Sequence, residues 1–443
     1  MANVIVVGGG IAGLAAAYRL QQRGFEVQVL EKEATPGGRM RSERHGGFVV
    51  ERGAQFIASS YKHMRRLSAE LGIDGEIEKL GDTRNAVLRR GRFELSQYDG
   101  LAAIRKSRDL SARSKLRLLG ILPTLLRHRR ELDFYRPQKA WQLDNENAAE
   151  YTSRRFGDEV LDYMIEPAFA GTFTVLPENM SKAFMLSTIA TLFRGFRLLS
   201  FRGGNGTLTQ ALAHRVPVRT DAAVERIEPG PHSVGVILES GGRLDADAVV
   251  LAVPGNAAGS LCSDLTPPER RFFSSVRYAS SIIAFVMAGE EALPPFYGAG
   301  FSRRERVRLY GMAVENAKSG VVPEGKTLFN CAFAEDYAAE LMDAPDEAVI
   351  EALNVELRKL PLLGLDTIEG YVIHRWPSLV PRFGPGYHRS LRDFLRREDR
   401  TPRVFFAGDY LIGPYTEAAL TSGLRAARDV GRFLGEQAAL TPA

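Results

Sequence analysis

The segment VIVVGGGIAGLAAAYRLQQRGFEVQVLEKE, residues 4–33, determines the fold class of this chain. It opens with four β-branched apolar residues, the pattern of a buried parallel strand. A glycine-rich turn, a predicted helix over 12–22 and a second predicted strand over 25–30 follow. The glycines of the turn have GxGxxG spacing: Gly8, Gly10 and Gly13. This order of strand, turn, helix and strand predicts a Rossmann-type dinucleotide-binding unit in an α/β fold.

These residues match the phosphates and the ribose of a dinucleotide. The glycines permit a tight turn, close approach of the backbone to a pyrophosphate and close packing of helix on strand, while the helix N-terminus faces the anion. Glu31 ends the second strand, where a carboxylate accepts hydrogen bonds from both hydroxyls of an adenosine ribose. The three glycines and Glu31, with the neighbouring Ala12 and Lys32, form the predicted nucleotide site. The alternative is a glycine-rich turn that binds no ligand.

Length and composition limit the class of protein. The 443 residues indicate two or three domains, and the 45% hydrophobic and 25% charged residues are typical of a globular protein. No run approaches the roughly 18 consecutive apolar residues that span a bilayer, and the start does not resemble a signal peptide. Cys262 and Cys331 stand in no disulfide or metal-ligand pattern, and the seven histidines are scattered. The sequence therefore predicts a cytoplasmic protein without a metal.

A second motif, PGGRMRSERHGGFVVERGAQFI, spans residues 36–57. A nicotinamide-binding domain would continue with another strand and helix, whereas here a glycine pair and an arginine come first. The motif resembles that of a large FAD-dependent group that contains flavin amine oxidases, protoporphyrinogen oxidases and carotenoid desaturases. The resemblance implies that Gly38 approaches FAD, that Arg39 neutralises its pyrophosphate, and that four residues pass beside the isoalloxazine ring. These four are Gly53, Ala54, Gln55 and Phe56.

Three further segments resemble the same group. Residues 403–427 look like its C-terminal FAD motif, which implies that Asp409, after Gly408, accepts a hydrogen bond from the ribityl chain. It also implies that backbone amides at Thr416 face the pyrimidine, where a helix N-terminus stabilises negative charge. Residues 220–255 predict a three-stranded meander, and the resemblance implies that the backbone at Val224 meets the adenine. Trp376 stands where the group has an aromatic residue near the flavin, or else is a core tryptophan.

The resemblance covers nearly the whole chain and implies an interleaved architecture. We expect a Rossmann-type FAD-binding domain from residues 1–80, 200–270 and 370–443, and an α+β substrate-binding domain from 81–199 and 271–369. Rab-binding GDP-dissociation inhibitors keep this fold without redox chemistry, so a non-catalytic binding protein is the alternative. Their flavin motifs are degraded, whereas the motif residues are intact here.

The members of this group remove hydride from a substrate carbon and differ in the substrate. Amine oxidases place a lysine near the flavin, but residues 277–289 contain none and Ala284 occupies the aligned position. Amine oxidases often bracket the amine with two aromatic rings. Tyr387 and Tyr415 are the candidates here, and the alternative is that they pack against the flavin. Residues 380–391 lack the cysteine that some amine oxidases attach to FAD, so we expect FAD to be noncovalent.

The middle of the chain resembles protoporphyrinogen oxidases most closely. Residues 156–181 look like a helix and loop that place a glycine, here Gly171, beside the substrate. Ala86 stands where that family often has a basic or polar residue for a propionate, which leaves the substrate open. We expect hydride removal from a tetrapyrrole or another biosynthetic intermediate without an obvious general base, with oxygen or a quinone as re-oxidant. Amine oxidation and carotenoid-type desaturation are the alternatives.

The net charge of +5 and a pI near 9.1 favour anionic partners, such as phospholipid or a carboxylated substrate, and no nucleic-acid-binding module is recognisable. The surplus is concentrated in residues 101–136, where Pro123 should kink or divide a helix with a leucine stripe. The stripe consists of Leu118, Leu119, Leu122, Leu125 and Leu126. Either this segment lies on the inner face of an anionic membrane, as basic amphipathic helices do, or its leucines pack on the substrate domain.

Overall fold

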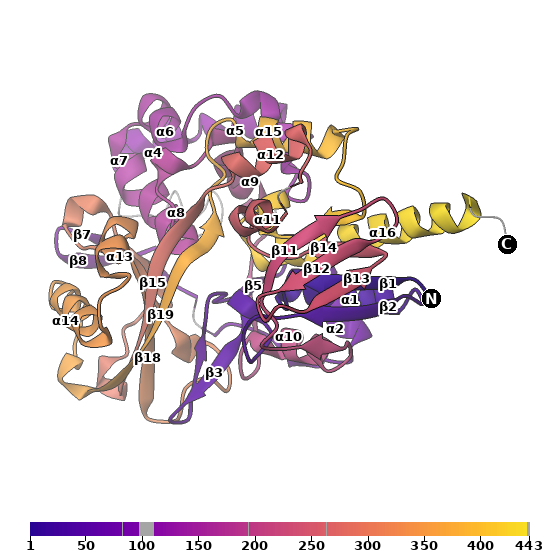
Figure 1. Cartoon of the computed structure of the whole chain (residues 1–443). Coiled ribbons are helices and arrows are strands. Elements are labelled where there is room, and N and C mark those ends of the chain that lie inside the picture. The colour runs from indigo at the N-terminus through magenta and orange to yellow at the C-terminus, as the bar shows by residue number, and fades with distance from the viewer. Residues whose placement is uncertain (82, 97–109, 194, 263, 441–443) are drawn as a thin grey trace.

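The computed structural model describes residues 1–81, 83–96, 110–193, 195–262 and 264–440. One half of the molecule, the cofactor half, is built on a five-stranded parallel sheet with the order β10–β2–β1–β14–β20 (Figure 1). The strands are β1 (Asn3–Val7), β2 (Glu26–Leu30), β10 (Val218–Arg219), β14 (Ala248–Leu251) and β20 (Val404–Phe406). All five come from the three segments predicted for the FAD-binding domain, and the α/β fold class is confirmed.

Helices and a smaller sheet complete the cofactor half. The helices are α1 (Ile11–Gln21), α2 (Lys62–Glu70), α10 (Gly206–Ala213), α11 (Gly255–Leu261) and α16 (Thr416–Leu440). The predicted meander is present as β11 (Val224–Pro229), β12 (Val234–Leu238) and β13 (Arg243–Ala246). A Cβ on Gly13 would lie 1.9 Å from the Gly8 carbonyl oxygen, and one on Gly423 would lie 2.0 Å from that of Ala12. Both glycines are therefore required by the packing of α1, the first on its strand and the second on α16.

The other half, the substrate half, is built on a seven-stranded sheet with the order β19–β15–β18–β17–β16–β7–β8 (Figure 1). Its strands are β7 (Asn85–Arg89), β8 (Arg92–Ser96), β15 (Tyr278–Gly289), β16 (Gly298–Gly300), β17 (Leu309–Val314), β18 (Lys326–Phe333) and β19 (Ile368–Pro381). All of its pairs are antiparallel except β16 with β7. Most of β19 thus belongs to this sheet, although the boundary predicted at residue 370 assigns it to the cofactor domain.

Two small sheets contain residues of the second motif. The hairpin of β3 (Ser42–His45) and β4 (Phe48–Glu51) comes first. The three-stranded sheet with the order β5–β9–β6 comes next and consists of β5 (Ile57–Ala58), β6 (Ile77–Lys79) and β9 (Leu198–Phe201). Because β5 begins directly after the segment predicted to lie beside the isoalloxazine, this sheet borders the site described below.

The remaining helices cover the substrate half and the junction of the two halves (Figure 1). They are α4 (Ala112–Leu118), α5 (Ile121–Arg127), α6 (Ala148–Phe156), α7 (Asp158–Val160), α8 (Glu166–Phe173), α9 (Lys182–Leu192), α12 (Pro267–Ser275), α13 (Glu335–Leu341), α14 (Asp346–Leu357) and α15 (Tyr387–Arg396). Within the described ranges, none of the helices is long and apolar enough to cross a membrane.

The basic segment is divided, as predicted, but not at Pro123. Residues 101–109 lie outside the described part of the chain; the break falls between α4 and α5, and Pro123 lies in the first turn of α5, where a proline is tolerated. The leucine stripe is divided too. Leu118 is buried and Leu122 and Leu125 pack against the core, whereas two leucines remain exposed. The exposed ones are Leu119 and Leu126.

Candidate functional site

A single cavity of about 1350 Å³ contains residues of both halves. It is larger than the roughly 300–1,000 Å³ of a typical small-molecule site, so it has room for more than one molecule. Most residues predicted from sequence line it: Gly8, Gly10, Ala12, Glu31, Lys32, Gly38, Arg39, Gly53, Ala54, Gln55, Phe56, Gly171, Val224, Trp376, Gly408, Asp409, Tyr415 and Thr416. Gly13 and Tyr387 do not line the cavity, the former because it is a packing residue.

The glycine turn forms the nucleotide end of the cavity. The Gly9 amide donates to Glu31 Oε2 at 2.7 Å and the Glu33 amide donates to Glu31 Oε1 at 2.9 Å. These bonds fix the buried carboxylate of Glu31 against the cavity. A Cβ on Gly10 would meet nothing within 4 Å, because this glycine opens directly into the cavity at the start of α1. The space beside Gly10 and the N-terminus of α1 therefore fit a pyrophosphate, and Glu31 fits its ribose.

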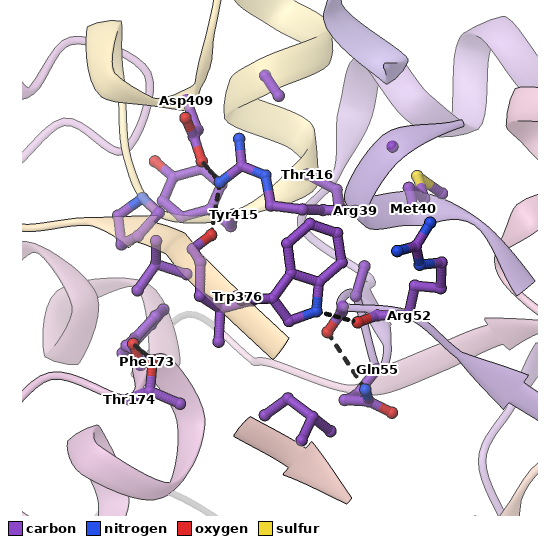
Figure 2. Close-up of a pocket in the computed structure, with 18 of the residues that line it drawn as sticks. Arg39, Met40, Arg52, Gln55, Phe173, Thr174, Trp376, Asp409, Tyr415 and Thr416 are labelled. Atoms are coloured by element: carbon purple, nitrogen blue, oxygen red, sulfur yellow. Dashed lines mark hydrogen bonds and ion pairs between the residues drawn. The ribbon is translucent and has the colours of Figure 1, made fainter. Parts of the chain in front are cut away.

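Arg39 joins the second motif to the C-terminal motif (Figure 2). Its Nη1 donates to Asp409 Oδ2 at 2.7 Å and to the Leu379 carbonyl oxygen at 2.5 Å. Asp409 Oδ1 also accepts hydrogen bonds from the Tyr278 hydroxyl at 3.2 Å and from the Tyr410 amide at 3.0 Å. The aspartate is almost fully buried, so its charge is balanced mainly by Arg39. Two motifs that are far apart in sequence thus share one polar cluster at the cavity wall.

Trp376 connects β19 to the second motif. Its indole Nε1 donates to the Arg52 carbonyl oxygen at 2.7 Å, and the Arg52 guanidinium lies over the indole, 5.2 Å from the ring centroid. Arg52 also donates to Glu33 Oε2 at 2.6 Å. Figure 2 shows the indole between the Arg39–Asp409 pair and Gln55. Of the two interpretations of Trp376, the structure favours a residue of the cavity wall over a core residue.

The two predicted tyrosines have different environments. Tyr415 lines the cavity, stacks on Phe134 with a centroid distance of 4.2 Å and donates to the Phe134 carbonyl oxygen at 2.6 Å. Tyr387 is only 5% exposed and packs on Phe383, and its hydroxyl donates to the Tyr410 carbonyl oxygen at 2.8 Å. Of the two interpretations of Tyr387, the structure favours packing, because α15 directs its ring into the core.

A buried carboxylate fixes the start of α16 behind Tyr415. Glu417 accepts hydrogen bonds from the amides of His63 and Met64, at 2.8 and 2.9 Å, and from the Tyr135 hydroxyl at 2.8 Å. Burial raises the pKa of Glu417 to about 7, although these donors favour its charged form. The contacts tie α2 and the segment of Phe134 and Tyr135 to the cavity wall, and sequence reasoning did not predict them.

The substrate half supplies residues that the sequence did not single out. Ile283, not Ala284, lines the cavity from β15, because neighbouring residues of a strand point to opposite faces and Ala284 lies in the core. Gly171 lies close to β16 and β17, since a Cβ there would be 3.4 Å from the Tyr310 carbonyl oxygen. Other lining residues are Lys79, Phe134, Thr172, Thr174, Phe196, Arg197, Tyr297 and Asn330. They are dispersed along the chain and form no contiguous motif.

The glycine turn, Glu31 and the cavity define a Rossmann-type dinucleotide-binding protein. Residues 11–431 match the family of flavin containing amine oxidoreductases, and the chain belongs to this family of oxidoreductases. Membership implies FAD, and the nucleotide end of the cavity has the donors, the carboxylate and the open glycine that FAD needs.

Three similar proteins illustrate the range of this fold. The coproporphyrinogen III oxidase of Mycobacterium tuberculosis (strain H37Rv) is 26% identical over 98% of this chain and 98% of its own length. The mitochondrial protoporphyrinogen oxidase of Nicotiana tabacum is 26% identical over 98% of this chain and 95% of its own. The structure of cyclohexylamine oxidase from Brevibacterium oxydans superposes with a TM-score of 0.76 at 17% identity, covering 98% of this chain and 99% of that one. Proteins named for different substrates are therefore similar to this chain in sequence or in fold.

Proposed function

We propose that this protein is a porphyrinogen oxidase: it binds FAD noncovalently and removes hydride from a carbon of a tetrapyrrole. The observation that carries the proposal is the single cavity, in which the cofactor residues are continuous with a wide, largely apolar space in the substrate half. The names of the relatives at 26% identity, which act on porphyrinogens, agree with it. The lack of a lysine in residues 277–289 argues against amine oxidation, and β15 presents the apolar Ile283 to the cavity.

Noncovalent attachment is supported by the environment of both cysteines. Neither Cys262 nor Cys331 lines the cavity, and both are buried. Burial raises the pKa of Cys262 to about 11 and that of Cys331 to about 12, so neither forms the thiolate that would attack a flavin. Acid precipitation of the purified protein should therefore release all of its flavin into solution. Flavin that remains on the polypeptide would contradict this part of the proposal.

The proposed mechanism assigns simple roles to the residues of this chain. FAD, when bound, supplies the acceptor for the hydride. Gly10 and Arg39 would hold its pyrophosphate, Glu31 its ribose, and the amides at Thr416 its pyrimidine. Ile283 and Gly171 line the cavity in the substrate half and would place a substrate carbon against the flavin. Catalysis then depends on positioning the reacting atoms at roughly 3–3.5 Å.

The proton needs no carboxylate or histidine on the substrate side. Among the described residues, the polar groups on the walls formed by α8, α9 and β18 are hydroxyls and an amide: Thr172, Thr174, Thr188, Thr191 and Asn330. Such groups do not take up a proton at neutral pH. A porphyrinogen loses hydride from a methylene carbon and a proton from a pyrrole N–H, so two electrons leave with the hydride and the proton passes to water.

Anaerobic stopped-flow spectroscopy tests the proposed reaction. The FAD-loaded enzyme is mixed with coproporphyrinogen III, protoporphyrinogen, a panel of primary and secondary amines, or a polyene, and flavin absorbance is followed. We expect rapid bleaching by a porphyrinogen and slow or no bleaching by the others. Bleaching by amines alone would contradict the proposal. Mixing the reduced enzyme with oxygen or a quinone then identifies the re-oxidant, for which we propose oxygen.

We also propose reversible binding of α4 and α5 to an anionic membrane surface. Leu116 and Leu126 are 71% and 67% exposed, and Leu119 is exposed as well. Exposed basic side chains accompany them: Arg113, Arg117, Arg127, Arg129 and Arg130. Each basic group near an anionic surface contributes about 1 kcal/mol, and exposed leucines insert into the interface.

Co-sedimentation with anionic liposomes at low salt tests this surface. We expect the wild type to bind and the variant Arg127→Glu/Arg129→Glu/Arg130→Glu to lose binding. The control reverses three cations on α2, with Lys62→Glu/Arg65→Glu/Arg66→Glu, and should still bind. Equal binding by both variants, or no binding by the wild type, would overturn the membrane role.

A further inference from the structure

One asparagine on the cavity wall has no hydrogen-bond partner in the described part of the chain. Asn330 of β18 is 5% exposed and lines the cavity. Its Nδ2 atom is enclosed by the wall and donates to no described atom. Burying an amide without a partner costs stability, so buried amides in folded proteins are nearly always hydrogen-bonded. The packing of the described residues therefore does not account for a polar side chain at this position.

The strand register directs Asn330 toward the cavity. Ala332, two residues further along β18, and its direct partner Ile283 on β15 both line the cavity. Ala313 of β17 is the direct partner of Asn330 and lines the cavity too. Direct partners and residues two apart in a strand share one face of a sheet, whereas the intervening Cys331 packs in the core of the opposite face. Since Nδ2 is enclosed, Oδ1 is the amide atom that Asn330 presents to the cavity.

The sheet around Asn330 is apolar and partly bare. The other cavity-lining residues of β15, β16, β17 and β18 are Ile283, Gly298, Ala299, Gly300, Gly311, Met312, Ala313 and Ala332. These four strands are fully described, and Asn330 supplies their only polar side chain on the cavity wall.

Gly298, the direct partner of Ala313, is left uncovered by the helices. Within 4 Å, a Cβ on Gly298 would meet only Asn85 Oδ1, at 3.2 Å, and the Met312 carbonyl oxygen, at 3.6 Å. Helix α8 instead packs directly on Gly300, where a Cβ would lie 2.5 Å from the Pro167 carbonyl oxygen. The backbone at Ala313 and Gly298 therefore forms a bare floor beside Asn330, on which a flat apolar body can lie.

This wall matches a neutral hydrogen-bond donor on an apolar ring. No carboxylate lines the cavity from α8, α9 or the four strands, all of which are described, so an ammonium group would lose its hydration there without a counter-charge. A pyrrole N–H is a neutral donor. In a porphyrinogen the bridging carbons are tetrahedral, so the pyrroles tilt and an N–H can reach an acceptor beside the ring. In the planar porphyrin the N–H groups point into the centre of the ring.

We propose that Asn330 Oδ1 accepts a hydrogen bond from a pyrrole N–H of the substrate and thereby selects the reduced ring over its planar product. This inference rests on the proposed function and names a residue that contacts the reacting ring. When hydride leaves a methylene carbon with both electrons, the ring becomes cationic and its N–H becomes a stronger donor. The bond to Asn330 then strengthens in the transition state, which lowers the barrier to hydride loss. The proton passes to water afterwards.

The test replaces the amide by an apolar side chain of the same branching, Asn330→Leu, with Asn330→Ala as a second variant that cannot crowd the wall. The matched control is Thr327→Val on the same strand. Thr327 is fully buried, its hydroxyl has no partner in the described part of the chain, and it does not line the cavity. Three quantities are measured on FAD-loaded protein: stability in urea, anaerobic flavin reduction by coproporphyrinogen III, and binding of the planar coproporphyrin III, followed by the flavin absorbance change.

We expect Asn330→Leu to be at least as stable as the wild type, because it removes an unpaired buried amide. Both Asn330 variants should need about tenfold more porphyrinogen for half-maximal reduction and should show a lower limiting rate of reduction. Their affinity for the planar porphyrin should equal that of the wild type, because no N–H of that ring reaches the amide. Thr327→Val should match the wild type in both ligand measurements.

Three results would contradict the inference while the proposed function stands. They are unchanged reduction kinetics in both Asn330 variants, an equal loss of affinity for porphyrinogen and porphyrin, which would indicate a change of cavity shape, and a loss of stability in Asn330→Leu, which would assign the amide to the fold. If no porphyrinogen reduces the flavin of the wild type, the proposed function fails and the inference with it.

Discussion

The two ends of the cavity are built in different ways. The nucleotide end consists of backbone amides, open glycines and a carboxylate, contributed by short motifs with fixed spacing. The substrate end is lined by residues of α8, α9, β15, β16, β17 and β18, which come from different parts of the chain. Backbone geometry suits a ligand common to a whole family, whereas individual side chains can change without loss of the fold. The first end therefore identifies the family and the second decides the substrate.

The largest expected effect tests the nucleotide end. Gly10→Val should fold normally, because Gly10 has an extended backbone and its Cβ meets no atom within 4 Å. The valine would occupy the space for the pyrophosphate. Loss of about two charge-assisted hydrogen bonds corresponds to about 4 kcal/mol, or roughly a thousandfold weaker FAD binding. The purified variant should be colourless with an unchanged far-UV circular dichroism spectrum, while Gly75→Val, at another open glycine, should stay yellow.

The next effect tests the pair that connects the two motifs. Arg39→Gln leaves the buried Asp409 without its cation and should destabilise the FAD-free protein by about 3 kcal/mol. Arg39→Gln/Asp409→Asn should recover much of this loss, because the uncompensated charge is removed. Urea unfolding of both variants measures the difference. Equal destabilisation of the single and double variants would show that packing, rather than charge, dominates here.

A smaller effect concerns β19, which pairs with β15 in the substrate half and supplies Trp376 to the cavity wall. Burial lowers the pKa of His374 on this strand to about 4, against about 6.5 in an unfolded chain. Because the unfolded chain binds the proton more readily, the histidine reduces stability as the pH falls from 6.5 to 4, by up to about 3 kcal/mol. Between pH 6.5 and 4, urea unfolding should show that His374→Leu loses less free energy of unfolding than the wild type. The control His214→Leu replaces an exposed histidine and should lose as much stability as the wild type. Parallel pH profiles of stability for His374→Leu and the wild type would contradict the prediction.

The smallest effect separates the two tyrosines. Tyr387→Phe removes one buried hydrogen bond to the Tyr410 carbonyl oxygen and should cost about 1 kcal/mol of stability, with no change in the flavin spectrum or in the rate of flavin reduction. Tyr415→Phe removes the bond to the Phe134 carbonyl oxygen at the cavity wall and should change the flavin spectrum. A change of reduction rate in Tyr387→Phe alone would reverse the assignment.

The sequence by itself determined the nucleotide end and the fold class. The glycine spacing, the carboxylate at the end of the second strand and the meander over 220–255 are local patterns, and each reports a backbone requirement that few residues satisfy. For this reason all predicted residues of the cofactor motifs except Gly13 line the cavity. Gly13 lies outside the cavity because it meets the third requirement of the glycine turn, the close packing of the helix on the strand.

Only the tertiary structure decided the substrate end. Tyr387 and Tyr415 have similar sequence support, but α15 directs one into the core and the start of α16 places the other at the cavity. Ile283 faces the cavity and Ala284 does not, because successive side chains of β15 point to opposite faces of the sheet. Such contacts depend on how distant elements pair and pack, and no local pattern of residues encodes that.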